Sequence, residues 1–196
     1  MNEVKEILVD VHTHHPRLGV LSPTMAGIHP WDAERGRDLP DFAHCDIIGE
    51  TGLDYASKVD KEAQARLFCH HLDIAEKLDK PVVLHIVKAF EPAMQILKKY
   101  SLKGVVFHGF IGSAEQAQRA ISQGYFLSFG DRSLRSPRTC EVIATMPIEN
   151  LFCETDDNRD ISIEQIYQSI AELRGISIEE LASQLIDNYK RVIYQR

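Results

Sequence analysis

The segment Ile7-Leu-Val-Asp-Val-His-Thr-His14 is a short apolar run of strand type that ends in two histidines, two positions apart. Side chains at this spacing in an extended chain project from the same face, so both imidazoles can reach one point. The same order recurs along the chain, where an apolar run ends in one further acid or histidine: Glu50, His85, His108 and Asp156. Because the carboxyl ends of parallel strands converge on one face of a (β/α) barrel, the recurrence predicts a shared site at that face.

From Asp46 onward the chain alternates between strand-type and helix-type segments. Strands are expected over residues 46–49, 82–84, 104–107, 125–129 and 150–154. Helices are expected from a cap at Asp60 to about Lys80 and over residues 90–100, 113–123 and 139–145, with two more at the C-terminal end. Ser113, Ser162 and Ser177 each precede a Glu or Gln by three positions, the spacing of a capping box. The alternation predicts a mainly parallel α/β sheet with helices outside it, a TIM-type (β/α) barrel.

The segment between His14 and Gly27 is too short for this pattern. Pro16, Gly19 and Pro23 interrupt it too closely for an ordinary helix, whereas a helical crossover takes a dozen or more residues. Two short strands, over 19–21 and 25–28, fit the available length. We therefore expect a barrel that is trimmed by the loss of one or two early outer helices, which accounts for a chain shorter than the usual length of about 250 residues.

Length, charge and cysteine content narrow the class of protein. With 196 residues and 44% hydrophobic content, the chain is expected to form a single domain over residues 1–196. A formal net charge of −7 excludes a global basic surface, so a nucleic-acid substrate would need a local basic rim or metal ions. The four cysteines form no C-x-x-C pair, and no leader or membrane-length apolar run is recognisable. A cytoplasmic protein without membrane contact or an obligate protein partner is expected.

The residues at the strand ends have the chemistry of a dinuclear metal centre, since buried imidazoles and carboxylates are costly unless they are paired or bind metal. The expected ligands are His12, His14, Glu50, His85, His108 and Asp156. Glu50 can bridge two cations, with His85 and His108 at the second. Two divalent metal ions are therefore the expected cofactors; this ligand set favours Zn or Mn and leaves Mg possible. Asp156 is the expected proton acceptor, and Glu50 is the other expected catalytic residue.

Other histidines have weaker contexts. His29, in Gly27-Ile-His-Pro-Trp31, also ends an expected strand, and it is either a substrate contact or an ordinary loop residue. His70 and His71 adjoin Cys69, but neighbours within a helix point in different directions. A solvated helix face is expected for these two histidines. Cys153 is expected to fill the core.

Motifs over nearly the whole chain resemble those of the TatD-like family of metal-dependent hydrolases, within the amidohydrolase-type barrel class. The matching segments are Asp10–His14, Gly27–Pro30, Ile48–Tyr55, Pro81–His85, Phe107–Ser113, Glu154–Asp156 and Asp187–Ile193. The stretch Gly-Glu-x-Gly-Leu-Asp-Tyr is the most specific of them. The resemblance implies the same six metal ligands, and it implies hydrolysis of phosphodiesters, commonly in DNA.

The chain departs from the family pattern around the substrate. The family usually places Ser-Arg after the strand-five histidine, where this chain has Ile86-Val87, with Lys88 one step further. A lysine binds as a point charge and cannot fork onto two phosphate oxygens as an arginine does. Cys-Phe-Ser becomes Gly109-Phe110-Ile111, and Asp157-Asn158 replaces a small residue and proline. Lys88 is nevertheless the expected substrate-binding cation, with further cations at Arg132, Arg135, Arg138 and Arg159, all of which could equally be a solubilising surface.

Three functions are compatible with these residues. The leading hypothesis is a TatD-like deoxyribonuclease, a phosphodiesterase that uses a metal-bridging hydroxide on DNA or another phosphodiester. The second is a metal-dependent hydrolase of a small amide, lactone or cyclic C–N substrate, which the acidic balance and the missing Ser-Arg favour. The third is a metal-binding protein without turnover, because a fold and a ligand set do not fix a reaction.

Overall fold

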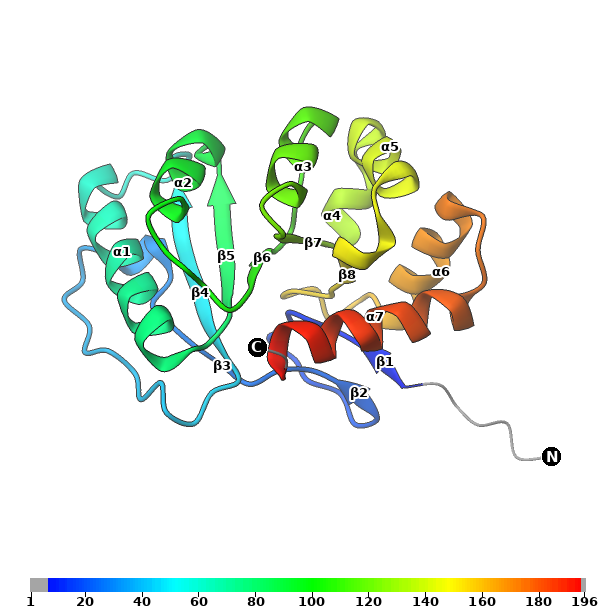
Figure 1. The fold of residues 1–196 in the computed structure, drawn as a ribbon, viewed down its shortest axis with the longest axis horizontal. Helices are drawn as coiled ribbons and strands as arrows, with labels where there is room; N and C mark the ends of the chain where they lie inside the picture. Colours follow the sequence, from blue (N-terminus) through cyan, green and yellow to red (C-terminus); the bar gives the residue numbers. More distant parts are fainter. Residues whose placement is uncertain (1–6, 195–196) are drawn as a thin grey trace.

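In the computed structural model, which describes residues 7–194, eight parallel strands surround the core (Figure 1). They are β1 (Leu8–Val9), β2 (Val20–Leu21), β3 (Met25–Ala26), β4 (Ile47–Asp54), β5 (Val82–Val87), β6 (Val105–Phe107), β7 (Phe126–Phe129) and β8 (Leu151–Cys153). The strands β3 to β8 form one sheet in chain order, and β1 pairs with β2. All of these pairings are parallel, as expected for an α/β barrel of TIM type.

The two sheets meet beyond the ends of β1 and β8. The Val11 amide donates to the Cys153 carbonyl at 3.1 Å, and Thr13 and Asp156 form a parallel bridge. Pairing therefore runs from β2 through β1 and β8 to β3, and within residues 7–194 no ladder joins β2 to β3. The first and last strands of the chain are neighbours in space.

The early outer helices are missing, as expected. No α-helix lies between β1 and β2 or between β2 and β3, and the connection from β3 to β4 holds only the short 3₁₀ helix η1 (Pro30–Asp32). The short strands β2 and β3 occupy the segment that is too brief and too rich in proline and glycine for a helical crossover. The loss of outer helices thus extends to the third connection, between β3 and β4.

Helices cover the remaining connections. They are α1 (Lys61–Leu78), α2 (Phe90–Leu97), α3 (Ala114–Ile121), α4 (Asp131–Leu134), α5 (Pro137–Thr145), α6 (Ile163–Arg174) and α7 (Ile178–Ile193), with the 3₁₀ helix η2 (Ile148–Asn150) before β8. Asp60 caps α1, and Ser113 and Ser162 form complete capping boxes. Ser177 accepts from the Glu180 amide, but the reciprocal contact of a full box is not made. No helix within residues 7–194 has the length and apolar character needed to cross a membrane.

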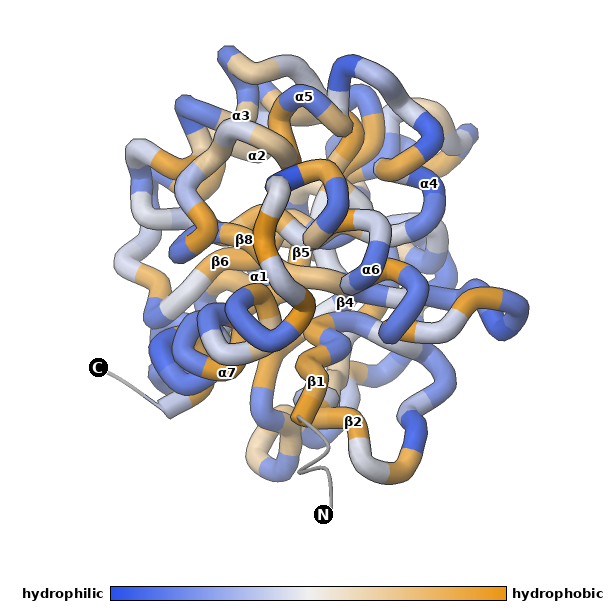
Figure 2. Tube along the Cα trace, turned by 90° about the vertical axis from the view of Figure 1, so that its right-hand side faces the viewer, coloured by the Kyte–Doolittle hydropathy of each residue, from blue (hydrophilic) through white to orange (hydrophobic). Residues whose placement is uncertain are grey.

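The strands are the most apolar part of the molecule, as Figure 2 shows for β1, β6 and β8. The side chains of Ile48, Leu84 and Phe107 are buried, and Cys153 fills the core as expected. Helix α7 packs on β1 and β8. The core therefore fixes the strand ends from which the polar residues project.

Two elements differ from the sequence-based expectation. Strand β4 continues to Asp54, whereas a loop was expected from Thr51. Its register against β5 shifts between Ile48 and Thr51, so β4 carries an irregularity that a simple apolar run does not reveal. The single-turn helix α4 was also not expected, because four residues are too few for an apolar period to show.

Candidate metal centre

The six expected ligands gather at the carboxyl end of the sheet. His12 and His14 follow β1, Glu50 lies within β4, His85 lies within β5, His108 follows β6, and Asp156 follows β8. Asp156 has a positive φ of 54°, and the turn is held because its amide donates to the His12 carbonyl while its own carbonyl accepts from the His14 amide. The contact between β1 and β8 therefore brings two histidines and a carboxylate from opposite ends of the chain into one cluster.

The first cluster contains His12, His14, Asp156 and Glu50. The Nε2 atoms of His12 and His14 lie 3.3 and 3.0 Å from Glu50 Oε1. The same nitrogens lie 3.5 and 3.7 Å from Asp156 Oδ1. His12 is almost completely buried, and its Nε2 atom has no hydrogen-bond partner in the described part of the chain. A buried nitrogen aimed at two carboxylates fits a cation at their centre.

The second cluster surrounds the other oxygen of Glu50. Glu50 Oε2 lies 2.9 Å from His108 Nε2 and 3.5 Å from His85 Nδ1. Those two imidazole nitrogens are 3.2 Å apart. The two oxygens of a single carboxylate therefore face two separate groups of imidazole nitrogens, as a bridging carboxylate requires.

The Nε2 atom of His29 lies 3.8 Å from Glu50 Oε2. By distance alone, His29, Glu50 and His85 could together hold a metal ion. The hydrogen bonding of His29 argues against a ligand role. The Nδ1 atom accepts from the Trp31 amide at 3.2 Å, so the proton of the neutral ring sits on Nε2. Burial, and then the neighbouring His85, lower the pKa of His29 to about 4, which keeps the ring neutral. His29 therefore presents an N–H donor to the site.

In His85 and His108 the outer nitrogen, the one directed away from Glu50, lies beside an acceptor, whereas that of His29 faces a donor. His85 Nε2 lies 3.4 Å from Asp54 Oδ2, and His108 Nδ1 lies 3.5 Å from Glu154 Oε1. An acceptor at the outer nitrogen holds the proton there and leaves a lone pair on the inner nitrogen, which is the arrangement that metal-ligating histidines use. Asp54 and Glu154 were not assigned as site residues from sequence. The signal was present, since both are acids in strand-end motifs, but only the side-chain geometry shows which histidine each one contacts.

The carboxylates dominate the electrostatics of the centre. Burial alone would raise the pKa of Glu50, but contacts from His108, His12 and His85 outweigh it and hold that pKa far below its usual range. For His108 burial lowers the pKa, yet Glu154 and Glu50 outweigh it and raise the pKa to about 10. The cluster therefore demands positive charge, which divalent cations would supply in place of protons. Together with the donor set, this demand fits a pair of divalent metal ions.

One further buried acid, Asp10, supports the site from behind. Asp10 accepts from the Thr155 amide at 3.0 Å and from its hydroxyl at 2.6 Å. Burial raises the pKa of Asp10 to about 7 in spite of these bonds. Asp10 thus fixes the residue before Asp156 and does not face the cluster.

His71 corrects one expectation. The ring is fully buried on α1, whereas a solvated face was expected, and only its neighbour His70 is exposed. Its Nε2 atom accepts from the Ile28 amide at 3.1 Å, and Nδ1 donates to the Leu67 carbonyl at 2.9 Å. His71 therefore ties α1 to the residue that precedes His29.

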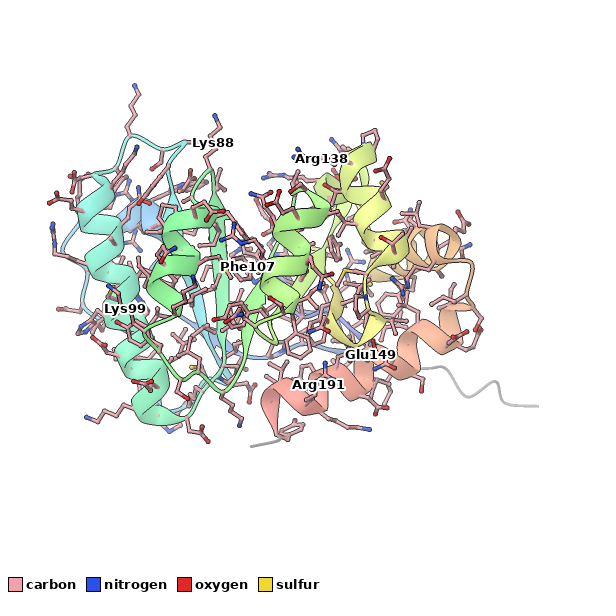
Figure 3. The ribbon with its side chains drawn as sticks, turned by 45° about the horizontal axis from the view of Figure 1, so that its top comes forward. Lys88, Lys99, Phe107, Arg138, Glu149 and Arg191 are labelled. Carbon is pink, nitrogen blue, oxygen red and sulfur yellow. The ribbon has the colours of Figure 1, made fainter. Side chains whose placement is uncertain are left out.

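The clusters open into a cleft of about 1060 Å³, which Trp31, Ile111, Arg132 and Asp157 also line. Lys88 does not line it. Its side chain is exposed, and Figure 3 shows it at the outer edge of the molecule, directed away from the body. Of the other expected cations, Arg132 and Arg135 line the cleft, while Arg138 and Arg159 do not. Arg135 is paired with Asp131, which leaves Arg132 as the arginine of the lining without an ion pair to a described residue.

A barrel with this cluster of histidines and carboxylates at the carboxyl ends of its strands is the architecture of metal-dependent hydrolases. The family model described as "TatD related DNase" matches residues 17–194. The chain belongs to the TatD family, and it is a metal-dependent hydrolase of that family.

Curated relatives carry the same class of name. The chain is 31% identical to the uncharacterized metal-dependent hydrolase YabD of Bacillus subtilis, over 74% of this chain and 64% of the relative. It is 29% identical to the uncharacterized metal-dependent hydrolase YcfH of Escherichia coli, over 86% and 72%. Human deoxyribonuclease TATDN3 is 28% identical over 68% and 54%. The chain thus spans about half to three quarters of the length of these relatives.

Solved structures share the fold. The TatD homologue YjjV of Escherichia coli superposes with a TM-score of 0.80 at 24% identity, over 95% of this chain and 97% of that chain. A TatD family hydrolase from Entamoeba histolytica superposes with a TM-score of 0.77 at 20% identity, over 91% and 76%. At these identities the likeness supports the barrel architecture alone.

Proposed function

We propose that this chain is a divalent-metal-dependent phosphodiesterase that hydrolyses DNA. The observation that carries the proposal is the position of Glu50, whose two oxygens each face a separate group of imidazole nitrogens. The name of the relative TATDN3, deoxyribonuclease, supports DNA as the substrate.

The expected ligands divide into two groups, each of which would hold one cation. His12, His14, Asp156 and Glu50 Oε1 would hold one cation. His85, His108 and Glu50 Oε2 would hold the other. Bound divalent cations would supply Lewis-acid polarisation of the phosphoryl oxygen and a water of lowered pKa. Asp54 and Glu154 keep the His85 and His108 rings in the ligating orientation.

Asp156 is the proposed proton carrier. Its carboxylate lines the cleft and is partly exposed, so water and substrate can reach it. Burial would raise the pKa of Asp156, but the contact with His12 outweighs it and lowers the pKa, so the group is in its basic form at neutral pH. Asp156 can take a proton from the attacking water and return it to the leaving oxygen. His29 would donate its Nε2 proton to a substrate oxygen.

Arg132 is the proposed phosphate contact, in place of Lys88. It lines the cleft from α4, and a guanidinium can fork onto two phosphate oxygens. Arg132→Ala should raise KM for DNA about tenfold with kcat little changed, because a uniform binding contact is lost. The matched control Arg138→Ala, an exposed arginine outside the cleft, should change neither constant.

The direct test is hydrolysis by metal-loaded protein of single-stranded DNA, double-stranded DNA and a chromogenic phosphodiester. Asp156→Asn should lower kcat by roughly 10²-fold, the scale of general acid–base catalysis. Turnover that is unchanged in a metal-replete Asp156→Asn protein would remove Asp156 from the mechanism.

A second candidate is hydrolysis of a small neutral or cationic amide, lactone or cyclic C–N substrate. The cleft lining favours it through Asp131 and the exposed Asp157, which repel an anionic substrate. Turnover of such a panel, without cleavage of any phosphodiester, would select this alternative.

The site of action that we propose is the cytoplasm. All four cysteines are free thiols, as is typical of a reducing compartment.

A further inference from the structure

Trp31 is the single tryptophan of the chain, and it is both fixed and exposed. Its indole Nε1 donates to Asp54 Oδ2 at 2.6 Å, while 55% of the residue remains accessible to solvent. It also lines the cleft over the metal centre. Trp31 therefore presents a fixed aromatic surface to a ligand in the cleft.

The ring is held in place before any ligand arrives. Asp54, its acceptor, also accepts from the Ala56 and Ser57 amides at 2.8 and 3.2 Å, so the carboxylate itself is immobile. Trp31 belongs to η1, whose first turn is capped by the His29 side chain. A ring that is fixed in this way loses little conformational entropy on binding a second ring.

The ring is also close to the reacting centre. The Trp31 ring centroid lies 4.4 Å from that of His29 and 5.9 Å from that of His85, both in edge-on contact. A group that stacks on Trp31 is therefore within about one ring width of a metal ligand and of the proposed His29 donor. Ile111, which is also exposed, adds an apolar surface to the same cleft.

We propose that Trp31 is a stacking platform for a nucleobase of the substrate, adjacent to the phosphate that is cleaved. This role rests on the proposed phosphodiesterase function. Base stacking on an aromatic side chain is tolerant of sequence because every base has a π-face, so Trp31 would select for nucleotides over base-free phosphodiesters without reading their order.

The experiment uses the emission of Trp31, which reports stacking independently of turnover. Zinc-loaded protein is titrated with thymidine 5′-monophosphate and, separately, with deoxyribose 5-phosphate, which lacks the base. Saturable quenching by the nucleotide and none by the sugar phosphate is the expected result. No saturable quenching by the nucleotide, or equal quenching by both compounds, would overturn the platform.

A matched control moves the fluorophore. In Trp31→Phe combined with Leu173→Trp, the only tryptophan lies on α6 at a solvent-exposed position outside the cleft, so the nucleotide should not quench it. Saturable quenching of that variant would show that the signal is not specific to Trp31 and would overturn the proposal.

Kinetics separate this proposal from the phosphodiesterase function. Trp31→Leu should raise KM about tenfold for the p-nitrophenyl ester of thymidine 5′-monophosphate and less than twofold for methyl p-nitrophenyl phosphate. Trp31→Phe, which keeps a ring, should lie between wild type and Trp31→Leu. An equal rise for both esters would overturn the platform. Saturable quenching without hydrolysis of either ester would leave the platform standing and refute the phosphodiesterase.

Discussion

At the scale of single residues, the proton on each imidazole decides what that imidazole can do. His85 and His29 both approach Glu50 Oε2, at 3.5 and 3.8 Å, so distance alone hardly separates them. The hydrogen-bond partners of their outer nitrogens do separate them. Asp54, an acceptor, faces the outer nitrogen of His85, while the Trp31 amide donates to the outer nitrogen of His29. A ring whose inner nitrogen carries the proton cannot offer a lone pair to a cation.

This difference makes a prediction for two matched variants. His29→Asn keeps an acceptor for the Trp31 amide and removes the Nε2–H group that faces the site, so the protein should retain both metal equivalents and lose activity. His85→Gln, which keeps a donor for Asp54 at the outer position and removes the inner Nδ1 atom, should lose one equivalent. Metal content by atomic emission, on protein dialysed against the same metal buffer, gives the comparison. Loss of one equivalent from His29→Asn would make His29 a ligand.

At the scale of secondary-structure elements, Gly52 allows strand β4 to lie close to β5. Its φ is +142°, and a Cβ atom there would lie 2.2 Å from the His85 carbonyl oxygen. Only a residue without a side chain lets β4 approach β5 so closely, two positions beyond Glu50. The close approach of β4 to His85 on β5 thus depends on the missing side chain at position 52.

Gly52→Ala should therefore cost at least about 3 kcal/mol of unfolding free energy and reduce metal occupancy at the His85 side. Gly175→Ala is the control, because its φ is also positive at +66° but nothing lies within 4 Å of the added atom. It should cost about 1–2 kcal/mol and leave metal content unchanged. Equal losses in the two variants, by urea denaturation, would show that the approach of β4 to β5 is not the cause.

Helix α1 acts on the site through His71. Burial, which the bond to the Leu67 carbonyl only partly offsets, lowers the pKa of this ring below its ordinary value of 6.5. Below about pH 6.5 the unfolded chain therefore binds more protons than the folded one. The contribution of His71 to stability is complete above that pH and is lost as the pH falls toward the lowered folded pKa.

The unfolding free energy of metal-free His71→Gln should accordingly fall less than that of wild type between about pH 7 and pH 5. Urea denaturation in the presence of a chelator measures both, because acid also displaces metal. A His71→Gln slope equal to that of wild type would mean that this ring does not titrate with folding.

The elements that could be predicted from sequence are those with a strong period or cap. The helix after Asp60 and the alternating strands from β5 onward follow from apolar spacing and capping side chains. The continuation of β4 past Gly49 and the single turn of α4 could not be predicted in this way. One depends on a local irregularity of pairing, and the other is shorter than one apolar period.

At the scale of the whole molecule, three acids of this acidic chain are buried in the metal centre, where an unpaired charge is most costly. Glu50, Asp54 and Glu154 are buried or nearly buried among the histidines, and the net charge of the chain is −7. Only the folded chain brings these acids and the histidines together, so metal should stabilise it by binding the native state alone.

Saturation with metal at about 100 times its dissociation constant should add roughly 2.7 kcal/mol per site, which corresponds to about 5–10 °C in Tm for a chain of this size. Thermal unfolding with a chelator and with Zn²⁺, Mn²⁺ or Mg²⁺ in turn tests this. The ion that gives the largest shift is the preferred one of the three. An unchanged Tm with all three would argue against a metal centre.

The position of the site was more predictable than the roles of its side chains. Strand ends converge by topology, so His12, Glu50, His85 and His108 could be brought together from sequence. Lys88 could not be placed, since the residue that follows a strand points into the cleft or out of it according to one backbone angle, and its φ of 51° turns the chain. The orientation of His29 depends on a hydrogen bond to a backbone amide, which no side-chain pattern encodes.

The bridge between Thr13 and Asp156 has a consequence for the order in which the site can be completed. The residues around Glu50 Oε2, from His29 to His108, are all synthesised before Asp156. His12 and His14 are synthesised before all of these residues, yet their partner Asp156 is added some 140 residues after them. The residues of one half of the centre are therefore present on the nascent chain first, and the other half closes only after Asp156 has been added.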